Sequence, residues 1–246
     1  MSNNPSMAFF AADSLAYELE TALSFLLQNG IIRATPEGLK TTDFGNLIAK
    51  SNYAVETAVK IKEYVSDMKE INVEEFIYAL SETPDLPLIS FKGRKSKDPV
   101  HEKLSECGLF AVDIGNPEAT TVSLIEWIDE RNEYEIENKY NVYSASTRRS
   151  AYDASRLVKF AKNTCEFLGD YSNLKEFDIL SARLYYGVKE DIIPLVIGVK
   201  RLGRKRARNL VNIFGNDLSN ISENELQKVY GIGPKLAQKI SMFTKN

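Results

Sequence analysis

The sequence is poor in the residues that build metal centres and covalent catalytic sites. Its 246 residues include one histidine, two cysteines and one tryptophan. Two cysteines cannot form a disulfide framework or a four-thiolate metal site, and a single histidine excludes most zinc sites and catalytic triads. We therefore expect no catalytic residue, no metal site and no cofactor in this chain.

An ATP-binding loop and a membrane segment are also missing. The chain contains no GxxxxGK[ST] sequence, the glycine-rich loop that P-loop motors need to hold ATP. The longest apolar run, residues 192 to 199, is far shorter than a membrane span and contains Pro194. We therefore expect a cytoplasmic protein that does not enter a membrane and hydrolyses no ATP on its own.

Charge is nearly balanced over the whole chain but unevenly distributed along it. The net charge is −3, and hydrophobic residues make up 43% of the sequence, enough for a buried core. Residues 145 to 208 hold 14 Lys and Arg against 7 Asp and Glu, a net charge of +7, whereas the rest of the chain carries −10. A basic segment in an otherwise acidic chain is typical of a local binding surface for an anionic polymer.

Apolar periodicity predicts a mostly α protein with three parts. Residues 1–53 follow the order helix (14 to 29), strand, turn, strand, helix, which is the back half of a winged helix. Over residues 54–186 the pattern predicts a helical bundle. We expect the acidic run Glu126 to Glu137 to be a solvated helix face of this bundle. Residues 187–246 form two repeated units of helix, glycine-bearing hairpin and helix. The helices of the bundle are expected near 54–68, 73–81, 98–107, 120–139, 145–169 and 174–186.

The hairpins of the last part resemble the helix-hairpin-helix DNA-binding motif. Residues 230–240 read Tyr-Gly-Ile-Gly-Pro-Lys-Leu-Ala-Gln-Lys-Ile. Glycines let the backbone approach a phosphate, and the N-terminus of the next helix offers amide donors, so such a hairpin binds DNA without reading its sequence. The first copy has arginine where the first glycine usually stands. The candidate DNA-binding residues are Lys200, Arg201, Gly203, Arg204, Lys205 and Arg206 in the first unit, and Gly231, Gly233 and Lys235 in the second.

The predicted helix 145–169 has two different faces. One stripe is apolar, whereas the roughly opposite stripe alternates cations and rings. A helix that follows a single strand needs cations for phosphates and rings for stacking on bases. A central bundle helix with aromatic side chains packed on both sides would give a similar pattern, and this alternative stays open. The candidate strand-binding residues are Arg149, Tyr152, Arg156 and Phe160.

Short sequences in a fixed order carry a resemblance to a known family. They are Ala22 to Ile32 with Leu39 to Ala49, Thr83 to Pro87, Tyr140 to Tyr143 with Arg148-Arg149, Gly187 to Glu190, and Arg201 to Leu210. Together they resemble the C-terminal half of the archaeal Hel helicases, superfamily 2 DNA helicases of the Ski-two-like group. The resemblance covers residues 14 to 240. These residues include neither of the two RecA-like motor domains of the family.

This resemblance implies a role for the long helix as the family's ratchet, which touches unwound DNA as the motor steps. The family pairs an arginine with an aromatic residue seven positions later. Arg149 matches the arginine, but Arg156 stands at the aromatic position, so stacking would fall to its guanidinium plane, Tyr152 or Phe160. The implied partners are single-stranded or branched DNA during repair and RecA-like motor domains in cis or in trans, which would bind ATP and Mg. The alternative is a helical adaptor that binds another protein.

Overall fold

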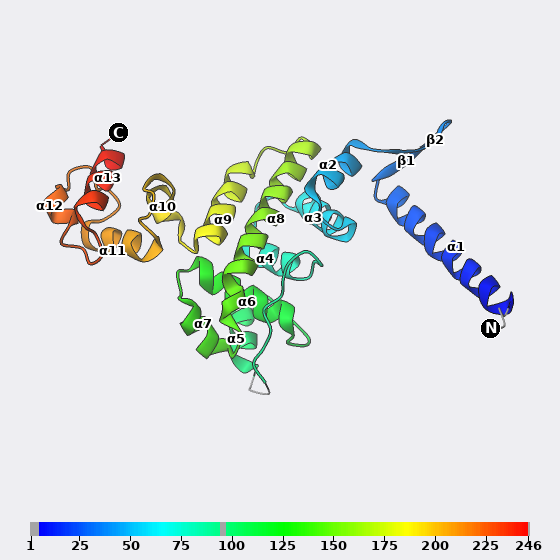
Figure 1. Cartoon of the computed structure of the whole chain (residues 1–246), viewed down its shortest axis with the longest axis horizontal. Helices are drawn as coiled ribbons and strands as arrows, with labels where there is room; N and C mark the ends of the chain where they lie inside the picture. The colour runs from blue at the N-terminus through cyan, green and yellow to red at the C-terminus, as the bar shows by residue number, and fades with distance from the viewer. Residues whose placement is uncertain (1–4, 94–96, 246) are drawn as a thin grey trace. The chain divides into compact units, whose positions relative to one another are not determined.

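The computed structural model describes residues 5–93 and 97–245 and divides into two compact units, Met1–Val59 and Lys60–Asn246. The described residues form thirteen α-helices and a single two-stranded sheet (Figure 1), which confirms the predicted mostly α class. The predicted hairpin domain lies in the second unit, whereas the bundle predicted over 54–186 begins six residues before that unit does. Within the described ranges, no helix has the length and apolar composition needed to cross a membrane.

The first unit is a helix, a β-hairpin and a second helix. Strands β1 and β2 are antiparallel, with Ile32 opposite Thr41, and Thr42 caps the following helix by accepting a hydrogen bond from Gly45 N. This order matches the one predicted, although α1 begins earlier than expected. Its identity as part of a winged helix stays a prediction. The elements are α1 (Pro5–Gln28), β1 (Ile32–Thr35), β2 (Gly38–Thr41), α2 (Asp43–Ser51) and the start of α3 (Val55–Asp67).

The larger part of the second unit is a helical bundle with α8 at its centre (Figure 1). Helix α8 packs against α4, α6 and α9, and its apolar stripe is buried. The predicted bounds of 73–81 and 174–186 agree with the structure. The elements are α4 (Val73–Ser81), α5 (Asp98–Glu106), α6 (Asn116–Ile128), α7 (Glu133–Tyr140), η1 (Ser144–Ser146), α8 (Thr147–Leu168) and α9 (Leu174–Tyr186).

The single helix predicted over 120–139 is wrong, because the chain breaks between α6 and α7. Glu130 takes a left-handed conformation (φ 73°), and Arg131 N donates to Glu126 O, which ends α6. Asn132 then caps α7 by accepting from Glu135 N. The predicted solvated acidic face is wrong for Glu126 and Trp127, which are 6% and 4% exposed.

The last part of the second unit has a small apolar core of its own. Residues from all of its helices contribute, among them Val188, Leu202, Leu210, Ile232 and Ile240. Gly198 allows α10 and α13 to approach, since a Cβ there would lie 2.0 Å from the ring of Phe243. The elements are η2 (Glu190–Ile192), α10 (Ile193–Gly198), α11 (Arg204–Phe214), α12 (Glu223–Leu226) and α13 (Pro234–Thr244).

Candidate nucleic-acid interface

The two predicted hairpins make the same turn hydrogen bond at positions thirty residues apart. Leu202 N donates to Val199 O and Ile232 N donates to Val229 O, both at 3.0 Å. Each hairpin is followed by a helix whose first turn closes on a glycine carbonyl, Gly203 O or Gly233 O. The internal repeat seen in the sequence is therefore a structural repeat of two hairpin turns.

The helices after the hairpins begin without a side-chain cap. Neither Gly203 before α11 nor Gly233 before α13 can supply one, and α13 begins with proline. The first amide groups of a helix have no partner within the helix, and the helix dipole favours an anion beside them. Each hairpin therefore presents amide donors where a phosphate oxygen can approach closely.

Arg201 stands in a backbone conformation that favours glycine. Its φ is 75°, close to the 83° of Gly231 at the corresponding position of the second hairpin. A residue with a Cβ in this region costs on the order of 1–2 kcal/mol. The first hairpin thus keeps the turn geometry at some cost in stability and gains an exposed cation.

Two of the predicted DNA-binding arginines, both only partly exposed, make contacts inside the protein. The Arg204 guanidinium lies 3.8 Å from the centroid of the Trp127 ring and donates to the carbonyls of Gly187 and Arg131. Burial lowers its pKa. Arg206 donates to Gly231 O at 3.2 Å and to Arg201 O at 2.8 Å, so its guanidinium connects the two hairpins.

The other hairpin candidates are exposed. Their side chains or backbone reach solvent around the two turns, and the cations among them can contact an anion there. They are Lys200, Arg201, Gly203, Lys205, Gly231, Gly233 and Lys235.

On α8 the structure separates the predicted residues into exposed and buried ones. Arg149, Tyr152 and Arg156 are exposed, and Tyr152 keeps 48% of its surface. Phe160 is only 3% exposed, so its prediction as a stacking residue is wrong. Because α8 packs against helices on several sides, its exposed stripe is narrow and Phe160 falls outside it.

Sequence reasoning missed the contacts that join the hairpin part to the bundle. Arg208 donates to Glu130 with Nε at 2.6 Å and Nη2 at 2.7 Å, and to Asp191 at 2.6 and 2.7 Å. Lys189 N also donates to Glu130. The indole of Trp127 donates to Leu184 O at 2.8 Å, which fixes the ring under Arg204. We call Arg204, Trp127, Arg208, Glu130 and Asp191 the arginine clamp.

The arginine clamp shifts the pKa values of its acidic members downward. Burial alone would raise the pKa of Glu130, but hydrogen bonds from Arg208 and from Lys189 N hold it below its usual range. The Arg208 hydrogen bond also lowers the pKa of Asp191, and both carboxylates raise the pKa of Arg208. Each partner therefore favours the charged form of the other.

Acid is expected to weaken the arginine clamp. The folded pKa values of Glu130 and Asp191 lie below the unfolded ones. Their stabilisation is thus fully present above the unfolded values and is lost as the pH falls through the folded values. We expect Arg208→Gln to lower the free energy of unfolding by about 2 kcal/mol at neutral pH. The penalty should shrink once the pH drops below the ordinary glutamate value of 4.5.

Urea unfolding of both proteins at about pH 7 and about pH 3 measures this difference. Lys162→Gln is the control, because it removes an exposed pair with Asp178 and should change little at either pH. A penalty for Arg208→Gln that stays constant with pH would contradict the carboxylate partners assigned to it.

The paired hairpins define a helix-hairpin-helix motif in the last part of the chain, and comparison with known families agrees. The family model described as "Helix-hairpin-helix motif" matches residues 193–246. This range contains both hairpins and all helices from α10 to α13.

The chain is also similar in sequence to helicases of the group named in the sequence analysis. The chain is 30% identical over 233 residues to "ATP-dependent DNA helicase Hel308" of Pyrococcus horikoshii. It is 27% identical over 225 residues to the protein of the same name from Pyrobaculum calidifontis, and 26% over 232 residues to that from Thermoplasma acidophilum. These matches cover 88%, 87% and 93% of this chain, but only 32%, 31% and 33% of the relatives. They confirm the predicted resemblance to Hel-type helicases, and the chain spans about a third of their length.

Proposed function

We propose that this chain binds DNA without reading its base sequence and grips single-stranded or branched DNA during unwinding in repair. The observation that carries the proposal is the pair of hairpins with matching turn hydrogen bonds, each presenting uncapped amide donors beside exposed cations. Contacts of this kind recognise the sugar-phosphate backbone and position a protein on DNA without sequence information.

The exposed face of α8 supports contact with a single strand. Arg149 and Arg156 are seven residues apart, which places both on one side of the helix, and Tyr152 lies between them. Cations at this spacing can follow a phosphate backbone while the ring faces the bases. We propose that α8 and the hairpins contact the same DNA molecule, with unwinding driven by RecA-like motor domains in cis or in trans that bind ATP and Mg.

The test is the salt dependence of binding to tailed, forked and duplex DNA, measured by fluorescence anisotropy. About five to seven phosphate contacts would give a slope of log affinity against log salt of roughly −4 to −6. We expect Arg149→Ala and Arg156→Ala each to weaken single-strand binding and to reduce the slope by about 1. The fold should be unchanged, because both side chains are exposed.

Arg148→Ala is the matched control. Arg148 is the neighbouring cation on α8, but it pairs with Glu133 at 2.7 Å. Its loss removes the same charge and should weaken binding less than Arg149→Ala does. Unchanged affinity in both Arg149→Ala and Arg156→Ala would remove α8 from the proposal and leave the hairpins. Equal affinity at low and high salt would contradict DNA binding through phosphates altogether.

A second candidate function is the binding of another protein through α1. Leu15, Leu19 and Leu27 recur along this helix and are 58%, 56% and 41% exposed, and Leu39 of β2 is 51% exposed. Apolar side chains gathered on a surface favour a protein contact. Failure of the chain to bind any tailed or forked DNA at low salt would favour this adaptor function over the first.

A further inference from the structure

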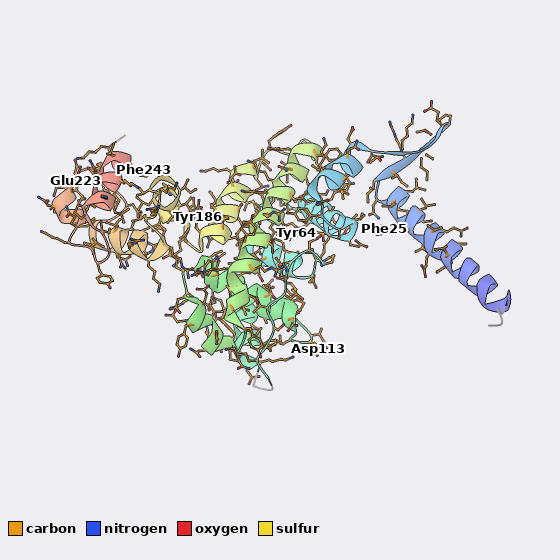
Figure 2. The ribbon with its side chains drawn as sticks, viewed as in Figure 1. Phe25, Tyr64, Asp113, Tyr186, Glu223 and Phe243 are labelled. Carbon is orange, nitrogen blue, oxygen red and sulfur yellow. The ribbon has the colours of Figure 1, made fainter. Side chains whose placement is uncertain are left out.

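The second hairpin carries an exposed aromatic ring at its turn. Tyr230 is 92% exposed, whereas Val229 before it and Ile232 after it are 2% and 4% exposed. Figure 2 labels Glu223 of α12 and Phe243 of α13, the two helices that this hairpin joins. The two buried neighbours anchor the turn in the apolar core of the hairpin part, so the ring projects into solvent from a fixed backbone.

The corresponding position of the first hairpin holds a cation instead of a ring. Lys200 lies thirty residues before Tyr230, the spacing that also relates the two turn hydrogen bonds. The next position differs as well, because Gly231 stands where the first hairpin has Arg201. The first turn thus presents two cations, whereas the second presents a ring beside a glycine. The two hairpins therefore offer different contacts to the same polymer.

The surroundings of the ring suit a nucleic acid. From residue 226 to the end, the chain has four lysines and no aspartate or glutamate. Lys235 and Lys239 are exposed one turn apart on α13. The last acidic residue before the hairpin is Glu225, whose carboxylate accepts a hydrogen bond from Ser222 Oγ at 2.6 Å. An apolar partner would gain little from the lysines, whereas a nucleotide has a base to stack and a phosphate to pair.

The structure of DNA decides where such a ring can stack. Inside a continuous duplex both faces of each base are covered by its neighbours, so only the base edges are accessible in the grooves. The last base pair of a duplex arm has one uncovered face. The duplex also holds this pair in place, so stacking on it costs less ordering than stacking on an unpaired base of a flexible strand. A ring at the turn of a hairpin therefore gains most where a duplex arm ends.

We propose that Tyr230 stacks on the terminal base pair where a duplex arm meets single-stranded DNA, while the amides of its hairpin bind the adjoining phosphate. The inference rests on the proposed DNA binding and adds a residue that distinguishes a junction from continuous duplex. It assigns this preference to the second hairpin, since Lys200 and Arg201 give the first turn charge without a ring. Stacking reads no sequence, because every base has a π-face.

The test compares three DNAs by fluorescence anisotropy at one salt concentration: a labelled fork, and an unpaired strand and a relaxed circular duplex as competitors. Because stacking on an aromatic side chain strengthens binding by about tenfold per base, Tyr230→Ala should weaken fork binding by about tenfold. Its affinity for the strand and for the circle, which has no end, should change little. Tyr230→Phe should bind the fork as the wild type does, because the ring remains. Tyr134→Ala, which removes a tyrosine that is 74% exposed on α7, is the matched control and should leave all three affinities unchanged.

Tyr230→Lys separates stacking from charge. The added cation should strengthen binding to the circle, whereas the loss of the ring should lower the ratio of fork to circle affinity as much as alanine does. A ratio that stays at the wild-type value in both variants would overturn the role of Tyr230 and leave phosphate binding by the hairpins intact. Equal losses on all three DNAs in Tyr230→Ala would overturn the assignment to the junction. Binding of none of them by the wild type at low salt would overturn the proposed function itself.

Discussion

Replacing Gly187 with alanine is expected to lower the free energy of unfolding by about 2 to 5 kcal/mol. Gly187 ends α9 with φ 64°, where a Cβ is strained. The added atom would also lie 2.4 Å from Cε2 of Trp127 and 2.4 Å from Nη1 of Arg204. Trp127 is buried and hydrogen-bonded, so its ring cannot move aside easily. The substitution therefore combines backbone strain with overpacking inside the arginine clamp.

Chemical denaturation of the wild type and the variant measures this loss. Gly169→Ala provides a matched control, because Gly169 ends α8 with φ 77° and a Cβ there meets nothing within 4 Å. It should show the conformational cost alone, about 1 to 2 kcal/mol. Equal losses in the two variants would contradict tight packing between Gly187 and the arginine clamp.

Replacing Arg206 with lysine is expected to weaken DNA binding about as much as replacing it with alanine, by about tenfold. The Arg206 guanidinium donates to carbonyls of both hairpins, Arg201 O and Gly231 O. A lysine keeps the charge, but its ammonium group lacks the planar fork that makes both contacts together. If the spacing of the hairpins depends on this contact, charge alone cannot restore binding.

Affinity for forked DNA at a fixed salt concentration measures the two Arg206 variants. Arg201→Lys is the control, since it keeps an exposed cation on the first hairpin and should bind nearly as the wild type does. Near-normal affinity of Arg206→Lys together with weak binding by Arg206→Ala would show that Arg206 contacts phosphate directly, as the sequence suggested. In that case its contacts to the hairpin carbonyls would not matter for binding.

Local sequence signals were sufficient for the elements whose boundaries depend on caps and glycines. The helix at 73–81 starts after the capping Asn72, and the helix at 174–186 ends at Gly187. The paired hairpins were also predictable, because glycine at fixed positions between short helices specifies the turn directly. These features need only neighbouring residues to form, so they can be inferred from the sequence alone.

Features set by distant residues could not be predicted in the same way. Periodicity placed Phe160 near the basic stripe of α8, but packing on several sides of that helix buries it. Arg204 looked like one more cation of the first hairpin until the fold brought Trp127 beneath it.

The arginine clamp has a mechanical consequence. Arg208 holds Glu130 of the bundle and Asp191 of the hairpin part at the same time, and Arg204 stacks on an indole anchored in the bundle. Rotation of the hairpin part relative to the bundle would have to break several charge-assisted hydrogen bonds together. Tension on a DNA strand bound by the hairpins would therefore be transmitted into α6 and α9. The hairpin part and the bundle would then move together.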